Sequence, residues 1–492
     1  MKSLLLILLI APICIRWLRW LAWFQQKEYR FDRLWIFIQT DQGQEELFGR
    51  LLPTKLDFSR TGLKRPKLTL RALVLALASS SLIYLMVYQA WELPFLFFSV
   101  VLLATHLSSP LAIFISNLPF SWAKSIYLWQ LEQQARQKIQ QKQPIVIGIT
   151  GSYGKTTTKT LIAHLLSGQY SVFAPPKSHN NRHSIAQSIV ENYHGQEMAV
   201  LEYAAYKAGE IKHLAESYQP DAAIITGLTD QHLAIFGSRE RIVQAKAELI
   251  AALKPRDPIF FNGADPGSEQ IVQAGLTEQS HNPQIDFSEQ TAEGRSIQVS
   301  RVGINQQGQL KFSWQGRVIQ TQLVGVHYLA AVKAAIAVGL YYNLEPELVR
   351  RKLESFIPPE FLIQVKTGLR GETVIDDGGT SNPQGFQAAL QLASELKNQN
   401  KELGRILLIT GGLVDLGQKT NLIHLQLAKQ AKEIVDQVYY LWQPGKAQFE
   451  KLFGADCLTD KINVLTHYHS IEKNTLCLIE GRIPGWMRKE MF

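Results

Sequence analysis

Residues 72–123 contain a single charged side chain, Glu92. It divides the stretch into two apolar runs, about 72–90 and 93–117. Each run is long enough to cross a hydrocarbon core, which requires about 20 helical residues. Glu92 and the nearby Pro94 indicate a tight turn at the membrane surface. The stretch therefore predicts a transmembrane helical hairpin, and the alternative is a helical hairpin buried in a soluble domain.

A third apolar segment, about 3–24, is interrupted by Arg16 and Arg19. It either spans the membrane with its arginines at the interface or lies on the surface as a Trp-rich amphipathic helix. The loop over residues 25–71 holds ten Lys or Arg against six acidic residues, so the positive-inside rule places it in the cytoplasm. The hairpin returns the chain to the same side. This predicts a protein of the cytoplasmic membrane whose residues from Lys124 onward face the cytoplasm.

The basic residues are concentrated in the apolar part of the chain. The 492 residues, enough for roughly three domains, carry a formal net charge of +9. Residues 1–143 hold 17 basic and 8 acidic side chains, whereas residues 144–492 hold 34 of each. This distribution argues against a nucleic-acid partner, since a nucleic-acid-binding domain would carry the basic excess itself. Cys14, Cys457 and Cys477 form no CxxC pair, which excludes a disulfide framework and an all-thiolate zinc site.

A phosphate-binding loop is predicted near residue 144, where the part of the chain with equal numbers of acidic and basic residues begins. Residues 145–150 are a β-branched run typical of a buried parallel strand. Gly151 and Gly154 follow in a short turn, and a helical pattern begins at Lys155. Strand, glycine-rich turn and helix in that order let backbone N–H groups point at phosphate oxygens. The strict pattern of such loops is not met, because its first glycine is Ile149 here.

The loop sequence TGSYGKTTT, residues 150–158, resembles that of the Mur ligases, ATP-dependent enzymes that join amino acids to the peptidoglycan stem. Further blocks follow in the family's order over residues 144–425, most similar to the branch that adds D-alanyl-D-alanine. These blocks are Asn180-Asn181, Glu202, Gly209 to Ile211, Thr226 to Leu233, Phe236 to Ser238, Ala245 to Glu248, Asn262 with Asp265, Val374 to Pro383, and Gly412 to Gly417 with His424.

The resemblance implies an ATP-dependent carboxylate–amine ligase of peptidoglycan precursor synthesis that works through an acyl phosphate. Its cofactors would be ATP and Mg²⁺. The implied catalytic residues are Lys155, Lys246 and His232, and the implied metal ligands are Thr156, Glu202, His232 and Lys246, the last carbamylated by CO₂. The implied nucleotide-binding residues are Gly151, Ser152, Gly154, Lys155, Thr156, Thr157, Asn262, Asp265, His327, Asp376 and Asp377. The implied substrate-binding residues are Asn180, Asn181 and Asn382.

Each of these residues also has a plain structural interpretation. A carboxylate at a strand end, such as Glu202, is often simply solvated. His232 alone would be a hydrogen-bonded structural histidine, and Lys246 on an amphipathic helix would face water. Asp376 and Asp377 fit either a ligand site at the end of a strand or an ordinary turn.

The chain departs from the family pattern in several places. In the adenine-side segment His327 is retained, but Tyr328 and Ala331 stand where the family has asparagines. No arginine occurs in residues 360–364, where the family has one that contacts phosphate. The membrane segments replace the family's UDP-binding domain. We therefore expect altered adenine contacts, weaker ATP use, and an acceptor that is lipid-linked or surface-bound.

The sequence thus predicts an α/β protein in three parts. These are a membrane module with linker (1–143), a P-loop domain with a mostly parallel sheet (144–357) and a Rossmann-like domain (358–492) with strands near 405–410 and 437–441. The expected partners are the membrane, a peptidoglycan-precursor peptide and an amino acid or dipeptide. Two alternatives remain: a catalytically impaired nucleotide-binding scaffold for cell-wall enzymes, and a polyglutamate or cyanophycin-type ligase.

Overall fold

The computed structural model describes the chain except residues 40, 50–64, 206, 230–235, 278–279, 289–290, 293–294, 379–381, 414–415, 417–418 and 443–444. The chain divides into two compact units, Met1–Gln130 and Leu131–Phe492. The first unit is helical and the second contains the sheets.

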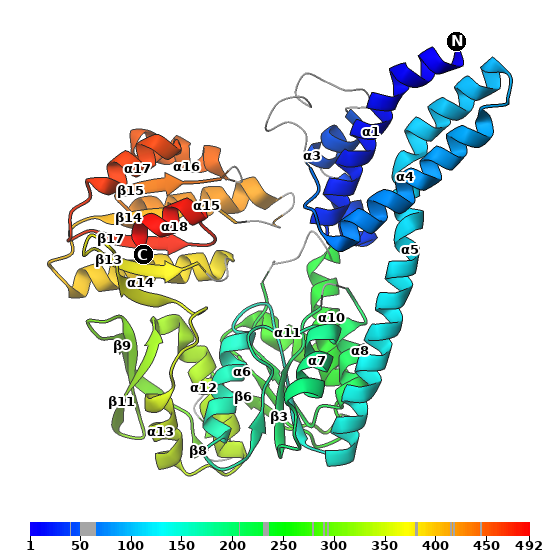
Figure 1. The fold of residues 1–492 in the computed structure, drawn as a ribbon. Coiled ribbons are helices and arrows are strands. Elements are labelled where there is room, and N and C mark those ends of the chain that lie inside the picture. The colour runs from blue at the N-terminus through cyan, green and yellow to red at the C-terminus, as the bar shows by residue number, and fades with distance from the viewer. Residues whose placement is uncertain are drawn as a thin grey trace. The chain divides into compact units, whose positions relative to one another are not determined.

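The first unit contains the predicted apolar helices (Figure 1). Its elements are α1 (Lys2–Gln26), α2 (Phe31–Ile38), α3 (Asp41–Gln44), the π-helical turn η1 (Glu45–Gly49), α4 (Leu70–Ala90) and the first part of α5 (Phe95–Lys142). Within the described residues α1, α4 and α5 are long and apolar enough to cross a membrane. The turn around Glu92 joins α4 to α5 as expected. Leu75 of α4 and Ile113 of α5 are buried in one apolar cluster, and Arg71 donates to Asn117 Oδ1 at 2.8 Å.

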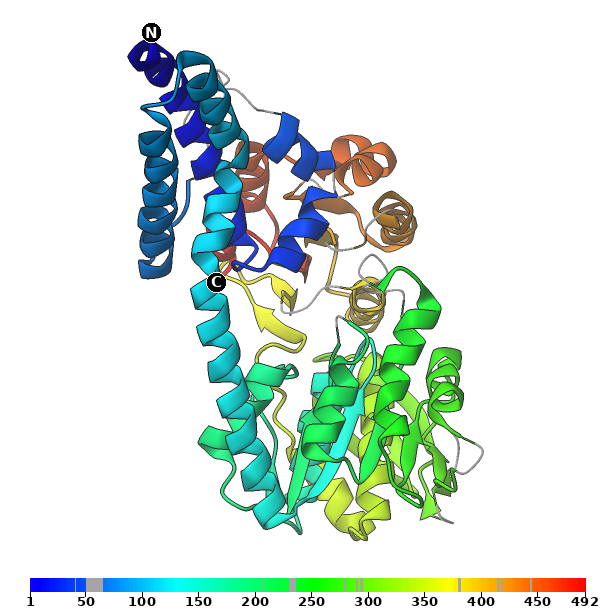
Figure 2. The ribbon, with the colours of Figure 1, turned by 90° about the vertical axis from the view of Figure 1, so that its right-hand side faces the viewer.

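Helix α5 extends past the end of the predicted span near 117 and through the linker that was expected before residue 144. It is a single helix of 48 residues that contains Pro110 and Pro119 (Figure 2). Each proline removes one backbone donor, and an apolar helix tolerates this where the neighbouring carbonyls find other partners. The last turns of α5 belong to the second unit.

The central sheet of the second unit is parallel throughout, with strand order β2-β3-β1-β4-β5-β6. Its strands are β1 (Ile145–Thr150), β2 (Val172–Phe173), β3 (Met198–Glu202), β4 (Ala222–Ile225), β5 (Ile259–Phe261) and β6 (Gln284–Asp286). Its helices are α6 (Lys155–Leu166), α7 (Arg182–Asn192), α8 (Glu210–Tyr218), α10 (Arg239–Ala251), α11 (Pro266–Gly275), α12 (Leu329–Tyr341) and α13 (Pro346–Ser355).

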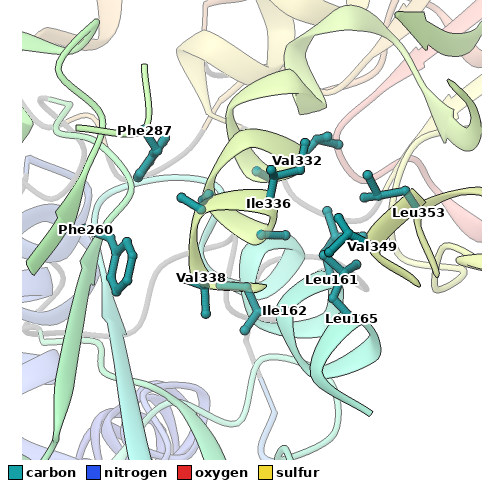
Figure 3. Packing of buried hydrophobic residues seen from close by; sticks show 14 of the residues in the cluster. Leu161, Ile162, Leu165, Phe260, Phe287, Val332, Ile336, Val338, Val349 and Leu353 are labelled. Atoms are coloured by element: carbon teal, nitrogen blue, oxygen red, sulfur yellow. The ribbon is translucent and has the colours of Figure 1, made fainter. Parts of the chain in front are cut away.

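Apolar clusters cover both faces of this sheet. On one face Leu161 and Leu165 of α6 pack with Ile336 of α12 and Val349 of α13 (Figure 3). The strands are buried on both faces, which is why β1 reads as an uninterrupted apolar run in the sequence.

A smaller antiparallel sheet follows, for which the sequence analysis made no prediction. It has the order β11-β10-β9, with β9 (Val299–Ile304), β10 (Gln309–Trp314) and β11 (Arg317–Val324). A two-stranded ribbon, β7 (Thr291–Ala292) and β8 (Arg295–Ser296), precedes it, and the 3-10 turn η3 (Val326–Tyr328) leads into α12. Alternate residues of β10 and β11 are buried, the pattern of a sheet with one solvated face.

The C-terminal sheet has the order β12-β13-β17-β14-β15-β16 and is parallel except for β12. Its strands are β12 (Gln364–Thr367), β13 (Thr373–Asp377), β14 (Ile406–Thr410), β15 (Gln437–Tyr440), β16 (Cys457–Leu458) and β17 (Leu476–Glu480). Its helices are α14 (Pro383–Gln399), α15 (Thr420–Ile434), α16 (Lys446–Phe453), the 3-10 turn η5 (Gly454–Asp456), α17 (Lys461–His469) and α18 (Gly485–Met491). The predicted fold class, two α/β sheets after apolar helices, is confirmed.

Candidate nucleotide and metal site

The glycine-rich loop lies at the C-terminal edge of the central sheet, between β1 and α6. Gly151 has a φ of +151° and Gly154 a φ of +71°. A Cβ atom on Gly151 would lie 2.0 Å from Oγ1 of Thr226, which follows β4, so only glycine fits there. Gly154 directly precedes the first turn of α6, whose backbone N–H groups are free of helical partners. This is the geometry of a phosphate-binding helix terminus.

Tyr153 at the tip of the loop is held by Asp265. Its hydroxyl donates to Oδ2 of Asp265 at 2.6 Å, and that oxygen also accepts from the backbone of Leu228 at 3.1 Å. Oδ1 of Asp265 caps α11 through the N–H of Gly267 at 2.8 Å. Burial, with the bond to Asp265, raises the pKa of Tyr153, which keeps the phenol a donor. Asp265 thus holds the loop in place through these hydrogen bonds. The nucleotide contacts expected of Asp265 and Asn262 remain predictions.

Thr156 and Glu202 come together beside the loop. Glu202 ends β3 and is 1% exposed, so it is not the solvated carboxylate of the structural alternative. Its Oε2 accepts from Oγ1 of Thr156 at 2.8 Å, and its Oε1 accepts from Nδ2 of Asn180 at 2.9 Å. Nζ of the buried Lys159 lies 3.9 Å from Oε2. Burial lowers the pKa of Lys159 to about 8, while the charge of Glu202 opposes that change.

This donor set fits a hard cation. A threonine hydroxyl and a carboxylate are oxygen ligands of the kind Mg²⁺ prefers, and that ion takes its other ligands from water and phosphate. Among the described residues no group of three or more His, Cys, Asp or Glu side chains is placed to hold a metal. His232, the predicted second-site ligand, lies outside the described residues.

Lys155 and Lys246 converge on the loop. Nζ of Lys155 donates to the carbonyl oxygen of Gly151 at 2.8 Å, and Nζ of Lys246 donates to the same oxygen at 2.9 Å. Lys246 is 8% exposed, so the expected alternative of a water-facing lysine does not hold. Burial, and then the charge of Lys155, lowers the pKa of Lys246 well below the usual lysine value. Burial also lowers the pKa of Lys155, against the attraction of Glu202. Lys246 is therefore disposed to be a neutral amine.

A cavity of about 210 Å³ adjoins the loop. Its walls include the loop and α6 residues Tyr153 and Thr157, the α12 side with His327, Tyr328 and Ala331, the segment Phe361–Ile363, and Asp377, Asn382 and Gln384. Burial lowers the pKa of His327 to about 4, so the imidazole is neutral. Five of the predicted site residues, Gly154, Thr157, His327, Asp377 and Asn382, thus line one cavity.

Asp376 and Asp377 end β13 but have different environments. Oδ2 of Asp376 accepts from Nζ of Lys366 at 2.9 Å and from Nη2 of Arg488 at 2.8 Å. Asp377 is paired in register with Glu480 of β17. Burial, and then the charge of Asp376, raises the pKa of Asp377 to about 7. The plain-turn alternative does not describe this buried carboxyl group.

The other predicted residues have local backbone roles. Asn181 caps α7 by accepting from the N–H of Ser184 at 3.1 Å, and Asn382 caps α14 by accepting from the N–H of Gly385 at 2.9 Å. The N–H of Ser152 donates to the carbonyl of Gly227 at 2.8 Å. Their substrate and nucleotide contacts stay predictions.

Two charged residues of the site were not predicted from the sequence, Lys159 and Arg488. Lys159 follows Lys155 by four positions, so helical spacing alone could have placed it on the same face of α6. Arg488 reaches Asp376 across 112 residues, and no local pattern signals that pair.

A parallel sheet, a glycine loop opening a helix, and lysine, threonine and glutamate side chains gathered at that loop define a P-loop nucleotide-binding protein of the α/β class. Residues 149–339 match the family model of the Mur ligase middle domain, so this part of the chain is similar to the Mur ligases.

The relatives include the UDP-N-acetylmuramoyl-tripeptide--D-alanyl-D-alanine ligases of Bacillus subtilis (strain 168) and Mycobacterium tuberculosis (strain ATCC 25618 / H37Rv). The first is 29% identical over 63% of this chain and 66% of its own length. The second is 29% identical over 58% of this chain and 56% of its own length. The chain thus spans less than two thirds of the length of either relative. The structure of MurF from Acinetobacter baumannii has a TM-score of 0.61 at 21% identity, covering 72% of this chain and 77% of that chain. MurF from Thermotoga maritima in complex with ADP has a TM-score of 0.59 at 23% identity, covering 72% and 80%.

Proposed function

We propose that the protein is a membrane-anchored, ATP-dependent ligase that joins a carboxylate to an amine in peptidoglycan precursor synthesis. The observation that carries the proposal is the cluster at the glycine loop, where Lys155, Thr156 and Glu202 surround the site expected for the nucleotide phosphates. The B. subtilis and M. tuberculosis relatives are named as ligases of this kind, which supports the same reaction.

In the proposed reaction an acceptor carboxylate oxygen attacks the γ-phosphorus of ATP, and ADP leaves. The resulting acyl phosphate is attacked at carbon by the amine of an amino acid or dipeptide. The amide bond forms, inorganic phosphate leaves, and the amine loses a proton. Bound Mg²⁺ would neutralise the phosphate charge, which otherwise repels the acceptor carboxylate.

The residues of the chain have distinct proposed roles. Lys155 binds the β- and γ-phosphates, and Thr156 with Glu202 holds the metal. Burial and the charge of Lys155 lower the pKa of Lys246, which favours the neutral amine that carbamylation requires. The carbamate would be an anionic metal ligand. His232 would serve a second metal. The cavity beside His327 would take the base, and Asn180, Asn181 and Asn382 would face the substrates.

The apolar helices support a membrane location. We propose that α1, α4 and α5 associate with the cytoplasmic membrane and that the later residues face the cytoplasm, because the basic loop 25–71 favours that side. The proposed functional division is 1–143, 144–357 and 358–492. Because helices long and apolar enough to cross a membrane precede the nucleotide-binding unit, a lipid-linked precursor peptide is the proposed acceptor.

A catalytically impaired scaffold is the competing proposal. Tyr328 and Ala331 at the cavity wall favour it, because neither offers the amide expected to contact adenine. The buried Glu202 and Lys246 favour a catalyst, since a scaffold gains nothing from these buried charges.

The test is ADP release by detergent-purified protein with Mg²⁺, bicarbonate, D-alanyl-D-alanine and a panel of soluble and lipid-linked muropeptides. We expect acceptor-dependent ADP release and a new amide by mass spectrometry, both lost in Lys155→Ala. ATP binding without turnover on any acceptor would support the scaffold instead. Equal turnover of UDP-linked and lipid-linked acceptors would remove the case for a lipid-linked substrate.

A further inference from the structure

The end of helix α5 is part of the central core. Leu131, Ala135 and Ile139 of α5 are buried in the apolar cluster that includes Ile185 and Ile189 of α7. All five residues belong to the second unit. The helix whose earlier residues are apolar enough to cross a membrane therefore ends as a structural element of the nucleotide-binding unit.

Glu132 on this part of α5 is 7% exposed and binds two residues of the second unit, Arg182 and His213. Its Oε1 accepts from Nε of Arg182 at 2.7 Å, and its Oε2 accepts from Nη2 of Arg182 at 2.7 Å. Nε2 of His213 on α8 lies 3.3 Å from Oε2. Burial acts to raise the pKa of Glu132, but the hydrogen bond and charge of Arg182 outweigh it and hold the pKa below the usual value. The geometry is a bidentate arginine–carboxylate pair.

Arg182 is the first residue of α7, and the residues before it reach the proposed metal site. Asn181 caps the helix, and Asn180 donates to Glu202 Oε1 at 2.9 Å. The carbonyl of Asn180 accepts from the N–H of Ala204, just beyond β3, at 3.1 Å. Asn180 is therefore hydrogen-bonded to Glu202 and Ala204. It also directly precedes the start of α7, where Arg182 is bound by Glu132.

We propose that Glu132 is a positioning residue for Glu202, acting through Arg182 and Asn180, so that the helix bearing a potential membrane span also orders the metal site. The proposal rests on the proposed function in one respect only, that Glu202 binds Mg²⁺. Partners that orient metal ligands in this way affect metal affinity although they do not touch the metal.

Helix α5 also offers a matched control. Nζ of Lys138, six residues after Glu132, donates to the carbonyl of Val190 at 2.7 Å and of Tyr193 at 3.4 Å, at the opposite end of α7. Both residues attach α5 to α7, but only Glu132 does so next to Asn180. Lys138→Gln therefore weakens helix docking at the end remote from Glu202.

The first experiment is amide hydrogen exchange on the full-length protein in detergent, without nucleotide or Mg²⁺. In Glu132→Gln we expect exchange over residues 178–184 to increase by roughly 10-fold or more. In Lys138→Gln we expect the increase at the C-terminal end of α7 and not over 178–184. Unchanged exchange over 178–184 in Glu132→Gln would overturn the proposal, and so would an equal increase in both variants.

The second experiment measures the Mg²⁺ concentration required for half-maximal tightening of ADP binding. Glu132→Gln should raise that concentration by roughly 10-fold and leave the ADP affinity in EDTA unchanged. Arg182→Lys, which keeps the charge but not the bidentate geometry, should give a smaller increase, and Lys138→Gln should stay within about 2-fold of wild type. An unchanged Mg²⁺ requirement in Glu132→Gln would overturn the positioning role.

The proposed function has its own control in the same titration. Glu202→Gln should abolish the Mg²⁺ effect on ADP binding. If Glu202→Gln behaves as wild type, Glu202 is not a metal ligand, and both the metal assignment and this inference fail. If Glu202→Gln abolishes the effect and Glu132→Gln does not alter it, only the inference fails.

Discussion

Lys155 and Lys246 donate to one acceptor, the carbonyl oxygen of Gly151, at 2.8 Å and 2.9 Å. Two buried ammonium groups on a single oxygen would repel each other strongly. The arrangement is relieved if one of them is neutral, and the pKa of Lys246 is lowered by its burial and by the charge of Lys155. A neutral lysine amine is also the form that reacts with CO₂.

Ligase activity should therefore depend on bicarbonate through Lys246. Lys246→Arg keeps a cation that CO₂ does not modify, and we expect ADP release to fall by about 100-fold. In wild type, ADP release should fall when bicarbonate is removed, and ¹³C-bicarbonate should give a carbamate NMR signal that grows as pH rises, because the neutral amine becomes more abundant.

Lys254→Arg is the control for that substitution, since the Lys254 side chain is 64% exposed. It should keep both the activity and the carbamate signal. A carbamate signal of unchanged intensity in Lys246→Arg would assign the modification to another lysine.

Gly151→Ala should damage the loop. The added Cβ would lie 2.0 Å from Oγ1 of Thr226, at a φ of +151°. We expect the free energy of unfolding to fall by about 2–4 kcal/mol and ADP binding to be lost. Gly303→Ala in β9 is the matched control, because a Cβ there meets nothing within 4 Å, and it should change stability by less than about 1 kcal/mol. Similar stability losses in the two variants would contradict the explanation.

Asp377 should make stability fall with rising pH. Its pKa is raised to about 7 by burial and by Asp376, so the folded protein holds this proton where the unfolded chain has lost it. Between about pH 4 and 7 the contribution of Asp377 to the free energy of unfolding therefore decreases as pH rises. Asp377→Asn removes the charged form, and its stability relative to wild type should rise by about 1–3 kcal/mol between pH 5 and pH 8.

Asp376→Asn should instead be less stable than wild type at pH 8. Asp376 binds Lys366 and Arg488, so losing its charge at pH 8 leaves two cations without their carboxylate and destabilises the protein. Thermal unfolding of both variants at pH 5 and pH 8 measures the difference. A stability gain for Asp377→Asn that is the same at both pH values would show that the carboxyl is not titrating there.

The loop and the strand-end carboxylates were predictable because their signals are local. The apolar run of β1, the glycines after it and the pattern of α6 are contiguous, and they fix one another's geometry. Glu202 and Asp377 each close a short apolar run, and parallel strands bring such ends to one edge of a sheet. The placement of these carboxylates follows from strand length alone.

Interactions between distant segments were not predictable in this way. The Glu132–Arg182 pair and the Asp376–Arg488 pair depend on sheet order and helix docking, which no spacing in the sequence encodes. The amphipathic pattern around Lys246 by itself indicated a water-facing side chain, and only the family resemblance placed Lys246 at the site. In the structure Lys246 of α10 is buried and donates to the carbonyl of Gly151 in the loop.

We expect the protein to discriminate weakly between ATP and GTP, and we expect Ala331→Asn to increase that discrimination. The residue lines the cavity beside the loop, at the position where the family pattern has an asparagine. Ala331→Asn supplies an amide donor and acceptor, and we expect ATP to bind about 3- to 10-fold more tightly, with little change for GTP. Calorimetric titration with both nucleotides measures the ratio. Ala330→Asn adds the same group one residue earlier in the same cavity wall, and an equal gain there would show that the position is not specific.

The membrane proposal is tested on α4. Leu77 is 69% exposed on a helix whose length and composition suit a membrane span, so in a bilayer this side chain would contact lipid. Arginine within a span costs about 2.5–3.5 kcal/mol of insertion free energy. Leu77→Arg should therefore reduce the fraction of protein that resists alkaline carbonate extraction. Glu92→Arg, at the turn after α4, changes charge where a membrane-spanning hairpin would meet water and should leave that fraction unchanged. If Leu77→Arg resists extraction as well as wild type does, α4 does not span the membrane, because an arginine that faced lipid would have reduced the resistant fraction.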